Sequence, residues 1–148
     1  MMKPIRVVIC GTGNGSHALA GVIASQADTE VCVLTRSLET VERWTQTREV
    51  QPLNVIFKDK AGDRPPLSTQ AFSITHDPEV AAKNCDLVLL GLPAFGHLPY
   101  LTRLGPYLEP GCTIVGLPGQ SAFEIDVNQA LGSKLQQCVV INLETFPW

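Results

Sequence analysis

The sequence has no excess of positive charge and no long hydrophobic run, and each absence excludes a class of function. Lysine and arginine number 11 against 14 acidic residues, so the net charge is −3. A surface that binds nucleic acid or an anionic membrane would carry a basic excess. No apolar run approaches the roughly 20 residues that span a bilayer, and the first residues have no signal-peptide layout. We therefore expect a cytoplasmic protein with neither nucleic acid nor a membrane as a partner.

The sequence also lacks closely spaced cysteines. Its five cysteines are widely separated and odd in number, which is not a disulfide framework. The absence of a Cys-x-x-Cys motif or a cysteine–histidine cluster gives no reason to expect a metal site. Each cysteine lies in or beside a strand-like apolar run. We interpret all five as small buried hydrophobic residues in a reducing compartment.

What is present is an alternation of short β-rich runs with longer helical patterns, in a chain of 148 residues that is long enough for one domain. Strands are predicted over 6–10, 31–35, 86–92, 113–117 and 138–143. Helices are predicted over 16–27, 38–50, 79–84, 98–108 and 122–131. This order predicts an α/β fold with a doubly wound, mostly parallel sheet. Residues 53–75 are the exception, and we interpret them as a small antiparallel excursion in which NVIFKD and FSIT flank a turn.

The stretch RVVICGTGNGSHALAGVIAS places three glycines between the first predicted strand and helix. In such a sheet, ligands bind outside the carboxyl ends of the strands. Gly11 would form a tight turn, Gly13 would let a pyrophosphate approach the backbone, and a helix starting near Gly15 would direct its N–H groups at that anion. The pattern is the dinucleotide-binding motif G-x-G-x-x-G/A with a serine in sixth place. The candidate cofactor residues here are Gly11, Thr12, Gly13, Asn14, Gly15 and Ser16.

The same glycine turn could instead bind nothing, or hold another phosphate ligand. The end of the second strand bears on the choice of cofactor, because an NAD-specific site tends to carry an acid there. This chain has Thr35 and Arg36 and no acid at that point. Arg36 could pair with a 2′-phosphate, stack on the adenine, or be a solvated cation at a helix start. NAD(H) and NADP(H) therefore both stay open.

Two further loops follow predicted strands, GLPAFGH at 91–97 and GLPGQSAFE at 116–124. A proline ends each strand and turns the chain over the place where the nicotinamide half of a cofactor would lie. Leu92, Pro93 and Ala94 are therefore added to the cofactor candidates, and His97 and Gln120 are candidates for contact with substrate. The alternative is that each proline simply marks a loop.

Five segments, CGTGNGSHALAG, ERWT, LPAFGH, IVGLPGQSAFE and ETFPW, together resemble the amino-terminal half of the octopine dehydrogenases, which are opine dehydrogenases. The resemblance covers essentially all 148 residues. It implies a Rossmann-type domain that binds NAD(H) or NADP(H), in an enzyme that condenses an amino acid with a 2-oxo acid such as pyruvate and reduces the imine with hydride.

The resemblance also implies a second, helical domain with the catalytic histidine, and the sequence ends at Trp148 before any such domain. We therefore expect residues 1–148 to be a dinucleotide-binding domain that binds cofactor without turnover, with no catalytic residue assigned. The resemblance places Glu144 and Thr145 near the amino-acid substrate. It also leaves Phe146, Trp148 and the last strand uncovered, which predicts self-association.

Two other functions stay open at this point. One is a related two-domain dehydrogenase of the glycerol-3-phosphate dehydrogenase or ketopantoate reductase type. The other is a stand-alone nucleotide-binding or redox-sensing module.

Overall fold

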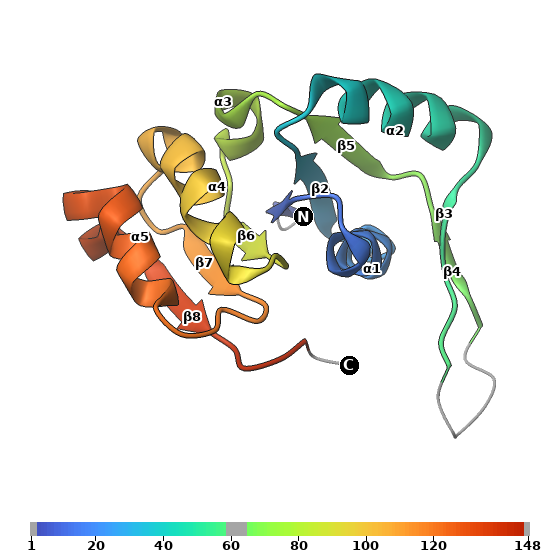
Figure 1. Ribbon diagram of the computed structural model, residues 1–148. Coiled ribbons are helices and arrows are strands. Elements are labelled where there is room, and N and C mark those ends of the chain that lie inside the picture. The colour runs from blue at the N-terminus through green and yellow to red at the C-terminus, as the bar shows by residue number, and fades with distance from the viewer. Residues whose placement is uncertain (1–2, 59–64, 147–148) are drawn as a thin grey trace.

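The computed structural model describes residues 3–58 and 65–146, and its main feature is a parallel sheet (Figure 1). Six strands pair in the order β5-β2-β1-β6-β7-β8, and every pair is parallel. The sheet confirms the predicted α/β class. Its strands are β1 (Ile5–Cys10), β2 (Thr29–Leu34), β5 (Phe72–Thr75), β6 (Leu87–Leu90), β7 (Thr113–Gly116) and β8 (Val139–Asn142).

Helices lie on both faces of the sheet, as the doubly wound pattern predicts. One core joins the sheet to the helices that follow β5, β6 and β7, and the other joins it to the first helix. The α-helices are α1 (Asn14–Ile23), α2 (Leu38–Val50), α3 (Pro78–Ala82), α4 (His97–Leu104) and α5 (Phe123–Leu131). Short 3-10 turns are η1 (Ala94–Gly96), η2 (Gly105–Tyr107) and η3 (Gly132–Gln137). None of the described helices is long and apolar enough to cross a membrane.

Two helix starts follow directly from the sequence. The Asp77 carboxylate accepts a hydrogen bond from the Glu79 amide at 2.9 Å, and Pro78 takes the first helical position of α3. Ser37 caps α2 by accepting from the Thr40 amide at 3.2 Å. Both are residue types that satisfy free N–H groups at helix starts.

The excursion over residues 53–75 differs from its prediction in one part. The antiparallel pair is β3 (Leu53–Val55) with β4 (Leu67–Thr69), and this hairpin packs against α1. The FSIT segment is β5, which pairs in parallel with β2 at the edge of the main sheet. The antiparallel excursion is thus confirmed, and only the assignment of FSIT to it was wrong, because alternation of Phe72 and Ile74 indicates a half-buried strand without indicating its partner. Both side chains pack into the core on the α1 face.

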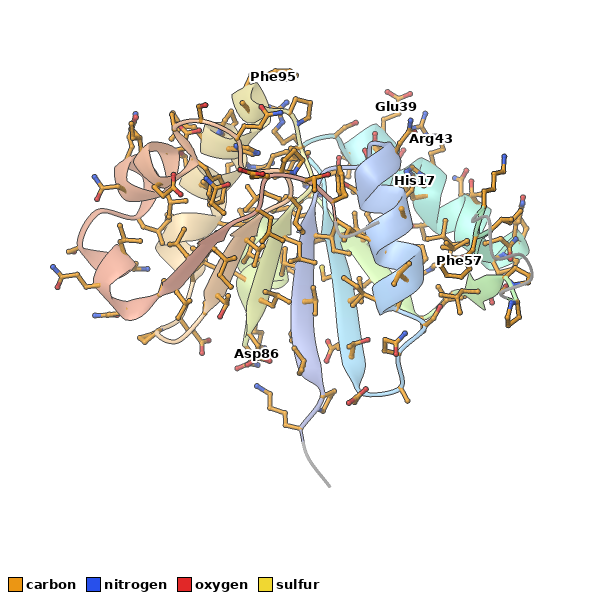
Figure 2. All side chains as sticks on the ribbon, turned by 90° about the horizontal axis from the view of Figure 1, so that it is seen from below. His17, Glu39, Arg43, Phe57, Asp86 and Phe95 are labelled. Atoms are coloured by element: carbon orange, nitrogen blue, oxygen red, sulfur yellow. The ribbon has the colours of Figure 1, made fainter. Side chains whose placement is uncertain are left out.

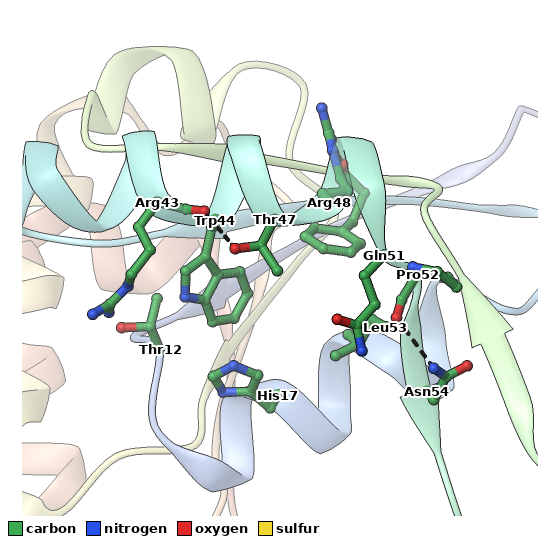
Figure 3. A pocket seen from close by; sticks show the side chains of 11 residues that line it. Thr12, His17, Arg43, Trp44, Thr47, Arg48, Gln51, Pro52, Leu53 and Asn54 are labelled. Carbon is green, nitrogen blue, oxygen red and sulfur yellow. Dashed lines mark hydrogen bonds between the residues drawn. The ribbon is translucent and has the colours of Figure 1, made fainter.

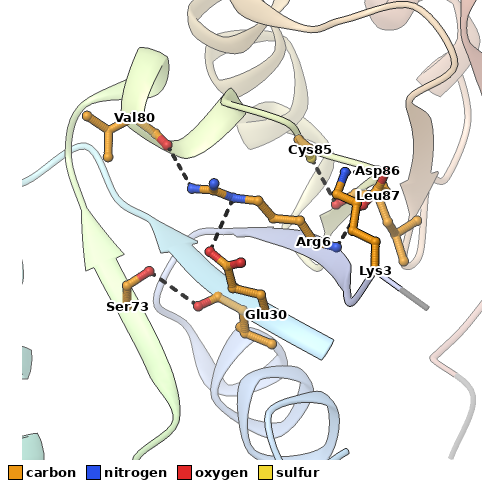
Figure 4. A network of polar contacts seen from close by, with 9 residues as sticks. Lys3, Arg6, Glu30, Ser73, Val80, Cys85, Asp86 and Leu87 are labelled. Carbon is orange, nitrogen blue, oxygen red and sulfur yellow. Dashed lines mark hydrogen bonds and ion pairs between the residues drawn. The ribbon is translucent and has the colours of Figure 1, made fainter. Parts of the chain in front are cut away.

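A polar network ties the amino ends of the strands together (Figure 4). The Arg6 guanidinium lies 3.7 Å from the Glu30 carboxylate and donates to the Val80 carbonyl at 3.3 Å. The Arg6 amide donates to the Asp86 carboxylate at 2.9 Å. Asp86 lies at the opposite end of the sheet from Phe95 and His17 (Figure 2). These charges are therefore structural, and they are remote from the carboxyl edge.

The far edge of the sheet is apolar and uncovered on one face. Val139 is 54% exposed and Ile141 is 42% exposed, whereas Val140 between them packs against the core that contains α5. Successive side chains of a strand point to opposite faces, so Val139 and Ile141 share the α1 face of β8.

Candidate functional site

The first turn at the carboxyl edge requires glycine at its first position. Gly11 has φ +90°, and its amide donates to the Leu34 carbonyl at 2.8 Å. A Cβ at this position would overlap the Leu92 side chain. The turn between β1 and α1 therefore follows the predicted motif in both conformation and packing.

The start of α1 is open toward the carboxyl edge. Gly13 is the N-cap residue, and α1 has neither a side-chain cap nor an acid in its first turn among the described residues. A Cβ built on Gly13 would meet no described atom within 4 Å. The first N–H groups of a helix have no partner within the helix and carry its positive dipole end. The geometry therefore fits a bound anion such as a pyrophosphate.

Ser16 turns its side chain inward. Its hydroxyl donates to the Cys10 carbonyl at 3.1 Å and is fully buried. The serine thus fills the sixth position of the motif as a small residue that packs α1 on β1. Only its backbone amide is left to face a ligand.

Beside the glycine turn lies a pocket of about 390 Å³, formed between the start of α1 and the loops that follow β6 and β7. It brings together six predicted residues: Gly13, Asn14, Gly15, Leu92, Pro93 and Gln120. Three lining residues were not predicted, namely Gly91, Pro118 and Phe146. Ala94 lies just outside, in η1.

Phe146 is the main residue that sequence reasoning missed. We expected its ring to be uncovered, but it is half-buried and packs into the core on the α1 face. A Cβ on Gly15 would overlap this ring, and a Cβ on Gly91 would lie 3.4 Å from it. Trp148, which we expected to be uncovered with it, lies outside the described residues. A signal was present, because Gly15 is not one of the positions for which the dinucleotide motif requires glycine.

His97 was expected to contact a ligand, but its ring is only 1% exposed and lines neither pocket. Nε2 donates to the Leu92 carbonyl at 3.1 Å, and the ring packs edge-to-face on Phe123 with centroids 5.1 Å apart. Nδ1 is buried without a hydrogen-bond partner among the described residues. Burial lowers the pKa of the imidazole, and the ring links the 92–97 loop to α5.

The end of β2 keeps its polar side chains occupied. Thr35 is buried, and its hydroxyl accepts from the Ser37 amide at 3.3 Å. The exposed Arg36 guanidinium lies 5.5 Å from the centre of the Tyr100 ring in α4, within cation–π range. Burial is the main cause that raises the pKa of Tyr100.

The loop after β7 is fixed to β8 by Asn142. Its side-chain amide donates to the Gln120 carbonyl at 3.2 Å and to the Glu124 carboxylate at 2.9 Å. The second hydrogen bond lowers the pKa of Glu124. Gln120 adopts φ +59° at the edge of the pocket. Glu144 and Thr145 are exposed and do not line it.

A second pocket, of about 490 Å³, opens between α1, α2 and β3 (Figure 3). The rings of His17 and Trp44 form one wall, with centroids 4.2 Å apart, and His17 Nδ1 lies 3.0 Å from the Gly13 carbonyl oxygen. Arg43 and Thr12 line the end of the pocket at the glycine turn. The sequence predicted only Thr12 of these residues as part of a site.

The chain matches no protein-family model, but curated proteins resemble it throughout. It is 39% identical to an opine dehydrogenase of Haliotis discus hannai, over 100% of this chain and 37% of that protein. It is also 39% identical to an octopine dehydrogenase of Pecten maximus, over 97% of this chain and 36% of that protein.

A solved structure of octopine dehydrogenase with NADH and L-arginine superposes with a TM-score of 0.92 at 39% identity, over 97% of this chain and 36% of that one. The chain thus spans about a third of the length of the relatives it matches. In sequence and in fold, it is similar to the amino-terminal part of these opine and octopine dehydrogenases.

Proposed function

We propose that residues 1–148 are the nicotinamide-dinucleotide-binding domain of an opine dehydrogenase. The observation that carries the proposal is the uncapped start of α1 at Gly13, which faces a pocket of about 390 Å³. The solved relatives are complexes with NADH, which supports NAD(H) as the cofactor. The open space at Gly13 and the absence of an acid in the first turn of α1, within the described residues, fit such a group.

In this proposal the glycine turn holds the pyrophosphate through the backbone N–H groups of Gly13, Gly15 and Ser16. Leu92 and Pro93 line the part of the pocket that takes the nicotinamide half of the cofactor, and Gln120 and Phe146 line the same pocket. The bound reduced nicotinamide supplies the hydride for reduction of an imine. The residues of this chain orient that donor and exclude water from one side of it.

The substrates are proposed to be an amino acid and a 2-oxo acid. The solved relatives are complexes with L-arginine, pyruvate and agmatine, which supports this class of substrate. Glu144 and Thr145 are exposed beyond the pocket, where a carboxylate could pair with a cationic amino acid. His97 acts on this site through the 92–97 loop, as a positioning residue.

Four buried thiols with no disulfide among the described residues support a cytoplasmic location.

Calorimetric titration with NADH tests the proposal when wild type is compared with two variants of one position. Gly13 has ordinary N-cap backbone angles and open space at its Cβ, so Gly13→Ala and Gly13→Asp should both fold. Aspartate is a favourable N-cap residue, so the free energy of unfolding of Gly13→Asp should lie within about 1 kcal/mol of the wild-type value. Its carboxylate takes the place of the anion and should weaken NADH binding more than about tenfold. Equal NADH binding by wild type and Gly13→Asp would contradict the proposal.

A further inference from the structure

Asn142 is the last residue of β8, at the carboxyl edge of the sheet. It pairs in register with Gly116, the last residue of β7. The two strands are neighbours in the sheet, and α5 lies beside them (Figure 1). The loop that connects β7 to α5, residues 117–122, therefore leaves the sheet next to Asn142.

The carboxamide of Asn142 joins this loop to two other segments. Its Nδ2 donates to the Gln120 carbonyl at 3.2 Å and to the Glu124 carboxylate at 2.9 Å, so one group holds both the loop and the first turn of α5. Gly119 packs on the same carboxamide, because a Cβ at that position would overlap its atom Oδ1. Both partners of Nδ2 are acceptors, so the side chain at this place has to carry an N–H₂ group.

The loop adopts a backbone that its residues do not favour by themselves. Gln120 has φ +59° and Ala122 has φ +70°, and neither is a glycine. Such residues stay in the left-handed region only where surrounding contacts hold them there. The backbone supplies one contact, since the Gly119 amide donates to the Leu143 carbonyl at 3.0 Å. Asn142 supplies the hydrogen bond at Gln120 itself.

The segments that Asn142 joins meet again at the pocket beside the glycine turn. Pro118 and Gln120 of the loop line this pocket, and so does Phe146, which follows Asn142 shortly after in the chain. The carboxamide itself does not line the pocket. Asn142 therefore acts on a ligand there through the residues that it holds.

We propose that Asn142 is a positioning residue that fixes the 117–122 loop against the nicotinamide half of the bound cofactor. The inference rests on the proposed function and adds to it a residue on which only one half of the cofactor depends. The pyrophosphate is held by the start of α1, and the hydrogen bonds of the Asn142 side chain lead to the loop and to α5 instead. Loss of the carboxamide should therefore weaken contacts with the nicotinamide and spare those with the pyrophosphate.

The test compares the dissociation constants of NADH and of ADP-ribose, which is the same molecule without the nicotinamide. Asn142→Asp keeps the size of the side chain and removes both donor hydrogens. It should raise the dissociation constant of NADH about fivefold and that of ADP-ribose less than about twofold. Asn142→Ala, which adds no charge, should show the same selectivity. Asn128→Asp, at an exposed position on α5, is the matched control and should change neither constant.

The outcomes separate this inference from the proposed function. Asn142 is exposed at the end of β8, so both of its variants should fold, which urea denaturation checks. Equal losses of NADH and ADP-ribose binding in these variants, or no loss of NADH binding, would overturn the inference and leave the proposed function in place. The same follows if wild type binds NADH no more tightly than ADP-ribose. If wild type binds neither compound, the proposed function fails, and the inference fails with it.

Discussion

The ring of Phe146 lies on the Cα of Gly15, so a residue near the end of the described chain packs against the first turn of the first helix. Its atom Cε1 is 3.0 Å from the point where a Cβ on Gly15 would lie. The same ring lines the pocket beside the glycine turn. Gly15 and Phe146, which are 131 positions apart in the sequence, thus line the same pocket.

This contact predicts that the effect of Gly15→Ala on the free energy of unfolding changes sign when the Phe146 ring is removed. Gly15→Ala should lower the free energy of unfolding by about 1–3 kcal/mol, because the added methyl must displace the ring. In a Phe146→Ala background the same change should raise it by up to about 1 kcal/mol, since alanine favours the helix over glycine. Urea denaturation of the four proteins measures both values. A Gly15→Ala change with the same sign in both backgrounds would show that the ring does not require this glycine.

The buried His97 predicts that stability falls in mild acid. The folded state holds the pKa of His97 below its ordinary value of 6.5, so the unfolded chain binds the proton more readily. The free energy of unfolding should therefore be fully maintained above pH 6.5 and decrease as the pH falls from there toward 5, by at most about 1.4 kcal/mol per pH unit. His97→Gln should flatten this slope.

Urea titrations between pH 5 and pH 8 measure that slope. The exposed His76 gives a matched control, and His76→Gln should keep the slope of wild type. An unchanged slope in His97→Gln would contradict the assignment of the acid sensitivity to the buried ring.

The five thiols should differ sharply in reactivity. Burial raises the pKa of the Cys10 and Cys32 thiols, and Cys85 and Cys112 are also buried. Cys138 is only half-buried. With Ellman's reagent at pH 8, one thiol should react in the native protein and all five in denaturant, since reaction needs an accessible thiolate. Cys138→Ser should abolish the native reaction, and a fast native reaction of two or more thiols would refute this reading of the core.

The apolar face of β8 predicts self-association. Ile141 and Val139 are exposed side by side on an edge strand, and removal of such a face from water favours association. Light scattering of wild type should show a mass that rises with concentration. Ile141→Lys should remove this rise, whereas Ile125→Lys, at a 66% exposed position on α5, should not. A wild-type protein that stays monomeric at high concentration would contradict self-association through this face of β8.

Local signals in the sequence were sufficient for most of the fold. The bounds of α2 (Leu38–Val50) agree with the prediction, and Asp77 with Pro78 marks the start of α3. Such signals depend on residues that are neighbours in the chain. The partner of β5 could not be predicted, because alternation of apolar residues is the same in parallel and antiparallel strands.

The residues of the candidate site likewise fall into those that local sequence predicts and those that only tertiary packing brings together. The glycine turn and Pro93 were predictable because their function requires a particular backbone at one place in the chain. The contact of Phe146 with Gly15 and the place of Arg43 beside Thr12 depend on tertiary packing. For Arg36, the sequence showed a cation at the end of β2 but not the Tyr100 ring that would engage it.

The most direct test of the central claim is a titration of the ¹⁵N-labelled protein with NADH, followed amide by amide by NMR. We predict the largest shift changes at Gly13, Gly15 and Ser16, because their N–H groups would hold the pyrophosphate. Smaller changes are expected at Leu92 and Gln120, at the edge of the pocket. Saturable binding that shifts these amides would support a dinucleotide site at the glycine turn. No shift at Gly13, Gly15 and Ser16, at NADH concentrations far above that of the protein, would contradict it.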